Sequence, residues 1–153
     1  MKTTHRLALL VIGMSILASS CANVKPGICQ AAHDGDLEKV KALLKSNPNL
    51  VFDTDIYDTT PLHYAATKDV AEVLLANGAL VNARNKYGDT PLHFAATNGL
   101  KDVPEVLLAN GAEVNAVDRP IGVGAKGETP LAQAESGGHN DVVEVLRQHG
   151  GRR

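Results

Sequence analysis

The stretch Thr90-Pro91-Leu92-His93-Phe94-Ala95-Ala96 decides the fold, because the chain repeats it. It occurs as Thr-Pro-Leu-His-Tyr-Ala-Ala at residues 60–66 and, more loosely, as Thr-Pro-Leu-Ala-Gln-Ala at residues 129–134. A short apolar pattern ending in Val-Leu-Leu or Val-Leu-Arg follows each copy. In two cases Ala-Asn-Gly-Ala-x-Val-Asn-Ala comes next, at residues 76–83 and 109–116. Self-similarity at this spacing indicates a stack of similar units.

The motif itself predicts a short helix. Thr90 suits the N-cap, where its hydroxyl can accept from a free N–H of the first turn. Pro91 then takes the first helical position, which needs no N–H. Leu92, Ala95 and Ala96 fall on one face, and the alanines let a neighbouring helix approach closely. Because so short a helix is marginal alone, it needs a neighbour on each side.

These residues resemble the ankyrin repeat, whose signature includes Thr-Pro-Leu-His-x-Ala. The resemblance implies an all-α solenoid of about four stacked helix-turn-helix units joined by β-hairpin-like fingers. We expect a repeat domain at 27–151, with repeats at about 27–56, 57–86, 87–119 and 126–151. The positions that carry the repeat motif are Thr60, Pro61, Leu62, His63, Thr90, Pro91, Leu92, His93, Thr129, Pro130 and Leu131.

The first 20 residues are predicted to be a signal peptide, followed by a tether at 21–26. Lys2 and Arg6 give a positive start, and the apolar run at 7–17 is too short for a membrane span but fits a signal peptide. The small residues before Cys21 resemble the bacterial lipobox, which implies lipidation of Cys21. By the same resemblance, Ala22 after the cysteine points to the outer membrane. The alternative is ordinary cleavage after Ala22 and a secreted protein.

Composition argues against nucleic acid as a partner. Loss of the leader takes away Lys2 and Arg6, so the formal charge goes from −2 to −4, and no basic patch stands out. Three Tyr, two Phe and no Trp leave a core of Ala, Leu and Val, as stacked small helices require. We expect a monomer that contacts the membrane only through the N-terminal lipid.

Several positions depart from a regular array. Repeat two is short by three residues between Ala66 and Val70, so its interhelical turn must be tighter or its first helix shorter. Residues 119–124 are an insertion, which is either a neutral surface loop or an enlarged binding finger. Residues 49–59 are expected to form the first finger, with Asp58 in the slot of Gly88. The first and last repeats read as caps, and residues 150–153 are expected to fray.

The sequence shows no catalytic motif and indicates no cofactor. His63 and His93 are equivalent in adjacent units, and the family resemblance implies that each hydrogen-bonds within the turn and finger network. Cys29 occupies the slot of His93 and is interpreted as a small buried residue. Cys29 with His33 would supply two metal ligands on one helix turn, which is too few for a site.

In the ankyrin family, partners bind the fingers and the exposed face of the first helices. Carried over by position, this implies a partner surface of Ile56, Tyr57, Thr59, Thr67, Lys68, Lys86, Tyr87, Asp89, Thr97, Asn98, Arg119, Ile121 and Val123. The sequence therefore predicts a non-catalytic protein-binding module of the bacterial cell envelope, lipid-anchored at Cys21. The alternatives are a secreted effector that binds a host protein and a thiol- or metal-dependent enzyme that uses Cys29 and His33.

Overall fold

The computed structural model describes residues 27–120 and 126–153. Within these ranges no helix has the length and apolar character needed to cross a lipid bilayer. The predicted signal peptide, the tether with Cys21, and Ile121 and Val123 of the insertion lie outside the described residues.

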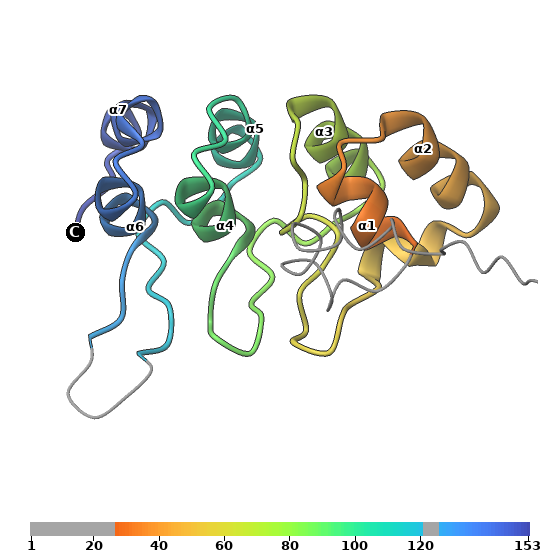
Figure 1. Cartoon of the computed structure of the whole chain (residues 1–153), viewed down its shortest axis with the longest axis horizontal. Helices are drawn as coiled ribbons and strands as arrows, with labels where there is room; N and C mark the ends of the chain where they lie inside the picture. The colour runs from red at the N-terminus through yellow and green to blue at the C-terminus, as the bar shows by residue number, and fades with distance from the viewer. Residues whose placement is uncertain (1–26, 121–125) are drawn as a thin grey trace, which may run out of the picture.

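The helices form two rows with loops projecting from one side (Figure 1). The inner row, next to the loops, is α1 (Ile28–His33), α4 (Pro91–Thr97) and α6 (Pro130–Ser136). The outer row is α2 (Leu37–Ser46), α3 (Lys68–Ala76), α5 (Val103–Ala109) and α7 (Asn140–Gln148). Because no strand occurs among the described residues, the all-α repeat solenoid predicted from the sequence is confirmed.

The motif helices begin where the sequence predicts. Thr90 and Thr129 are the N-cap residues of α4 and α6, and a proline follows each at the first helical position. In α6 the hydroxyl of Thr129 accepts a hydrogen bond from the Ala132 N–H. Asp36 likewise caps α2 by accepting from the Lys39 N–H. The start of each of these helices is therefore fixed by local chemistry.

Small and branched side chains fill the space between the two rows. Leu92, Ala95 and Ala96 of α4 are buried, as are Val106 and Leu107 of α5. Direct contacts run along each row, from α4 to α6 and from α3 to α5 to α7. The core is thus one continuous layer to which each repeat contributes, so each repeat is stabilised by its neighbours.

Repeat two lacks its first helix. Residues 60–64 form consecutive tight turns, with i to i+3 bonds such as His63 N–H to the Thr60 carbonyl at 3.1 Å. Ala66 then donates its N–H to Ala32 of repeat one, also at 3.1 Å, instead of to its own helix. Of the two outcomes expected from the missing residues, the loss therefore falls on the first helix. Leu62 and Ala65 nevertheless stay buried.

Two further expectations need correction. Residues 49–59 are not wholly a finger, because a 3₁₀ helix, η1 (Pro48–Phe52), follows α2 and the finger begins after it. Residues 150–153 do not fray: Arg152 donates its N–H to Asn115 Oδ1 at 2.7 Å, and its carbonyl accepts from the Thr129 hydroxyl at 2.6 Å. The side chain of Arg153 contacts Glu135. Polar bonds to the last finger hold this segment in place, which the sequence pattern does not reveal.

Candidate partner-binding surface

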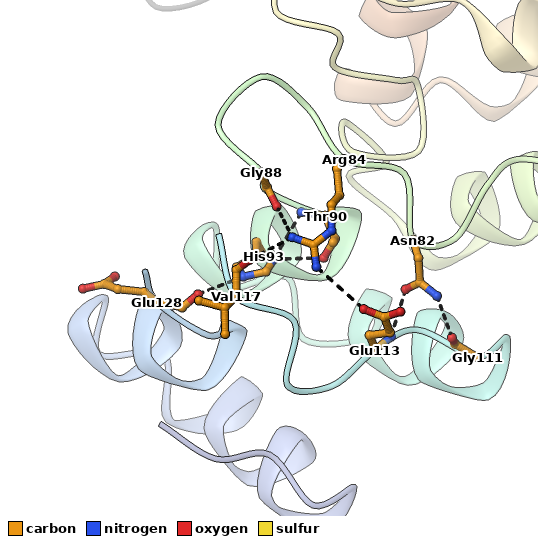
Figure 2. Close-up of polar contacts among 9 residues, drawn as sticks. All are labelled: Asn82, Arg84, Gly88, Thr90, His93, Gly111, Glu113, Val117 and Glu128. Carbon is orange, nitrogen blue, oxygen red and sulfur yellow. Dashed lines mark hydrogen bonds and ion pairs between the residues drawn. The ribbon is translucent and has the colours of Figure 1, made fainter. Parts of the chain in front are cut away.

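Each motif histidine ties its own turn or helix to the finger that follows it along the chain. His63 Nδ1 accepts from the Thr60 N–H at 3.2 Å, and its Nε2–H donates to the Asp89 carbonyl of the next finger at 3.1 Å. His93 makes the same pair of bonds, to the Thr90 N–H and the Glu128 carbonyl, both at 3.1 Å (Figure 2). The expected turn-and-finger role of both residues is confirmed, and each histidine spans two repeats.

This role requires neutral imidazoles. Burial lowers the pKa of His63 to about 4, although the bond to the Asp89 carbonyl opposes the shift. Burial also lowers the pKa of His93, and its bond to the Glu128 carbonyl opposes that shift. Both rings are therefore uncharged near neutral pH, with one nitrogen accepting and the other donating.

A side-chain oxygen at the base of each finger closes the finger on itself. Asp55 Oδ1 accepts from the N–H groups of Tyr57 at 2.8 Å and Thr59 at 2.9 Å. Asn85 Oδ1 accepts from Tyr87 at 2.9 Å and Asp89 at 3.0 Å in the second finger. Asp and Asn favour such local turns because their short side chains reach the backbone two residues on.

The third finger repeats this device with Asp118, whose Oδ1 accepts from the Glu128 N–H at 2.7 Å. In the first finger the same hydrogen bonds also lower the pKa of the carboxyl group. Burial alone would raise the pKa of Asp55, but hydrogen bonds from Thr59, the Tyr64 hydroxyl and Tyr57 hold it below its ordinary value. Asp58 takes the positive-φ position of the first finger that Gly88 takes in the second, as the sequence predicts, with φ of 60° and 80° respectively.

Neighbouring fingers are linked through their backbones. Lys86 donates its N–H to the Tyr57 carbonyl at 2.9 Å, and Arg119 donates to the Tyr87 carbonyl at 2.7 Å. The rings of Tyr57 and Tyr87 lie 5.8 Å apart between centroids. The finger tips therefore form one connected surface rather than independent loops.

Long polar side chains add a second set of links at the finger bases. Arg84 donates to the carbonyls of Gly88 at 3.1 Å and Val117 at 2.8 Å (Figure 2). Asn82 donates to the Gly111 carbonyl and accepts from the Glu113 N–H, at 3.0 and 2.9 Å (Figure 2). These bonds fix the third finger relative to the second.

The comparison with known families agrees with this geometry. The family model for ankyrin repeats in three copies matches residues 28–118. The chain belongs to the ankyrin repeat family. No match is found among curated proteins. Ankyrin repeats are protein–protein interaction modules and are generally non-catalytic, so the surface formed by the fingers is a candidate binding surface.

Most of the predicted surface residues are accessible in the ankyrin array. Ile56 and Tyr87 are 63% and 40% exposed. Tyr57 and Asp89 are half-buried, and the remaining exposed members are Thr67, Lys68, Lys86, Thr97, Asn98 and Arg119. Thr59 is a correction: it is 2% exposed, because the finger closes around it through Asp55. Its side chain therefore does not belong to the surface.

A hollow of about 490 Å³ lies on this surface between the second and third fingers and the inner helices. We call it the interfinger hollow. Five of its lining residues belong to the predicted surface: Tyr87, Asp89, Thr97, Asn98 and Arg119. Four others were not predicted: Phe94, Asp118, Glu128 and Gln133. Thr67 and Lys68 lie elsewhere, in a second hollow formed by residues 66–69 and 99–103 where repeat two lacks its turn.

The residues proposed for metal or thiol chemistry are placed in the N-terminal repeat. Cys29 is buried in the core, as its slot in the motif predicts. His33 is exposed and contacts the Tyr64 ring, with centroids 6.2 Å apart. Across residues 27–120 and 126–153, no three His, Cys, Asp or Glu side chains are grouped closely enough to hold a metal ion.

Sequence reasoning missed the residues that position the fingers. Asn82 and Asn115 occupy the same place in the repeated Ala-Asn-Gly-Ala-x-Val-Asn-Ala segment, and each bonds backbone of the next segment. Their recurrence was the available signal. Asp118 takes the same place in its finger as Asn85 takes in the second, so its recurrence was also an available signal. Arg84 has no arginine at the equivalent position of another finger, so only the structure identifies its contacts.

Proposed function

We propose that the chain is a non-catalytic, protein-binding ankyrin module of the bacterial cell envelope, anchored by a lipid on Cys21. The observation that carries the binding role is the connected finger surface, on which the side chains of Ile56 and Tyr87 are exposed. Exposed aromatic and apolar anchors beside a concave surface are what interfaces use as hot spots. The protein acts as a monomer and binds through its fingers.

The anchor rests on the sequence of the leader. A positive start, a short apolar run and small residues before Cys21 support export and lipidation. Diacylation would hold the protein stably at the membrane, since each buried CH₂ adds about 0.8 kcal/mol. Mass spectrometry of the mature N-terminus tests this. A lipid-bearing Cys21 is expected, whereas an unmodified terminus at Asn23 would favour the secreted alternative.

The binding role is tested with matched variants. Ile56→Ser with Tyr87→Ser removes two exposed anchors from the fingers, while Phe52→Ser with Leu80→Ser removes comparably exposed side chains from outside the finger tips. Both pairs should leave the melting temperature nearly unchanged. Only the finger pair should release a protein that the wild type captures from envelope extracts. Undiminished capture by the finger pair would refute binding through the fingers.

A further inference from the structure

The interfinger hollow combines aromatic surface with an excess of negative charge. Tyr87 from the second finger and Phe94 from α4 supply the aromatic area, and Tyr87 is 40% exposed. Asp89, Asp118 and Glu128 line the same space. The lining contains three carboxylates against one guanidinium, that of Arg119.

The three carboxylates are not equally available. Both oxygens of Asp118 are already used, by the Glu128 N–H at 2.7 Å and by Gln133 Nε2 at 2.8 Å. Glu128 is exposed, and its carboxylate points away from His93 while its carbonyl faces the ring (Figure 2). Asp89 is half-buried, and its Oδ2 accepts a long hydrogen bond of 3.5 Å from Asn85 Nδ2. Asp89 and Glu128 therefore retain acceptor capacity toward the hollow.

We propose that the interfinger hollow receives an arginine side chain of the partner protein. A planar guanidinium can stack on an aromatic face and donate to carboxylates in the same plane, which matches this lining better than the point charge of lysine does. An acidic partner segment is disfavoured because it would face three carboxylates. This inference rests on the proposed function and names the chemistry of the partner at one position of the surface.

The probe is the tripeptide acetyl-Gly-Arg-Gly-amide, which is titrated into the ¹⁵N-labelled mature protein. Binding is followed by NMR through the backbone amide signals. The neutral isostere of this peptide has citrulline in place of arginine, and lysine and glutamate versions complete the set. The arginine peptide should shift the amide signals of Tyr87, Phe94 and Glu128. The citrulline version should bind at least about fivefold more weakly, as loss of partly exposed ion pairs implies.

Variants locate the effect. Asp89→Asn with Glu128→Gln removes two charges that hold no finger together, and should weaken arginine-peptide binding about fivefold. Arg119→Gln removes the competing cation and should strengthen binding about twofold. The matched control is Glu105→Gln with Glu144→Gln on the exposed side of α5 and α7, which should leave the dissociation constant unchanged.

Four results would each overturn the inference: equal binding of the citrulline peptide, preference for the glutamate peptide, lysine binding as tight as arginine, or shifts that map to the hollow at 66–69 and 99–103. The proposed function fails separately. If the arginine peptide ignores the interfinger hollow but the finger variants still lose their captured protein, only this inference is wrong. If the arginine peptide binds and the finger variants capture normally, the interfinger hollow binds arginine but the captured protein does not dock through the fingers, so the proposed function is wrong.

Discussion

Acidification from pH 7.5 to pH 5 should destabilise the fold through His63. This ring accepts at Nδ1 and donates at Nε2, so a proton added at Nδ1 removes the acceptor for the Thr60 N–H. Its folded-state pKa is about 4, while an unfolded histidine titrates near about 6.5. The unfolded state therefore takes up the proton first, and stability is lost as the pH falls through 6.5 toward 4.

The size of the loss follows from the two pKa values. Between pH 7.5 and pH 5, His63 alone should lower the free energy of unfolding by about 2 kcal/mol. His93 acts in the same direction because burial lowers its pKa as well. Asp55 contributes little in this window, since its pKa lies below the usual carboxyl range. For a domain of this size the melting temperature should fall by roughly 6–10 °C.

The assay is urea or thermal unfolding, followed by circular dichroism at several pH values, of wild type and His63→Gln. The variant is less stable at pH 7.5, but its stability should depend on pH by about 2 kcal/mol less over the window. Leu107→Ala lowers stability through a buried apolar side chain and changes no titrating group, so it is the control and should keep the wild-type slope. A wild-type stability that is flat to pH 5, or a His63→Gln slope equal to wild type, would refute the reasoning.

Further predictions concern packing, turn geometry and the C-terminal segment. Leu107→Ala removes a fully buried side chain and should cost about 2–5 kcal/mol of unfolding free energy in urea titration. Gly88→Ala, at φ of 80°, should cost at least about 1 kcal/mol by the same measurement. Asn115→Ala should cost about 1–3 kcal/mol and speed hydrogen exchange at residues 150–152. Insertion of Thr-Asn-Gly between Ala66 and Thr67 should add a helical turn, visible as a stronger far-ultraviolet signal at 222 nm, roughly one turn's worth.

The sequence predicts those features that arise from adjacent residues. Thr90 and Pro91 fix the start of α4, and Asp58 takes the positive φ that Gly88 takes in the next finger. Both features depend on residues adjacent in the sequence, so they can be recognised without knowledge of the tertiary contacts. The ankyrin signature then supplies the stacking, because each motif histidine bonds the following finger.

The remaining features depend on neighbours distant in the sequence. Thr59 looks like a finger-tip residue, yet Asp55 folds the chain over it. Nothing in the final Gly-Gly-Arg-Arg indicates that Asn115 and Thr129 will bind it. Asp118 and Glu128 enter the interfinger hollow only because the third finger packs beside α4 and α6. Asp118 and Glu128 were therefore missed, whereas Asp89 was predicted; of the two aromatic residues, Tyr87 was predicted and Phe94 was not.

The loss of the first helix in repeat two should determine where the protein begins to unfold under force or denaturant. Ala66 donates its N–H to the Ala32 carbonyl, so a backbone hydrogen bond joins the first two repeats. In a regular repeat the equivalent N–H bonds within its own helix. On the other side, repeat three faces the hollow where a turn is missing. Mechanical pulling from both ends, or brief exposure to denaturant, should therefore separate the molecule first at the boundary between repeats two and three. The N-terminal pair would separate as one piece, and repeats three and four would keep their shape.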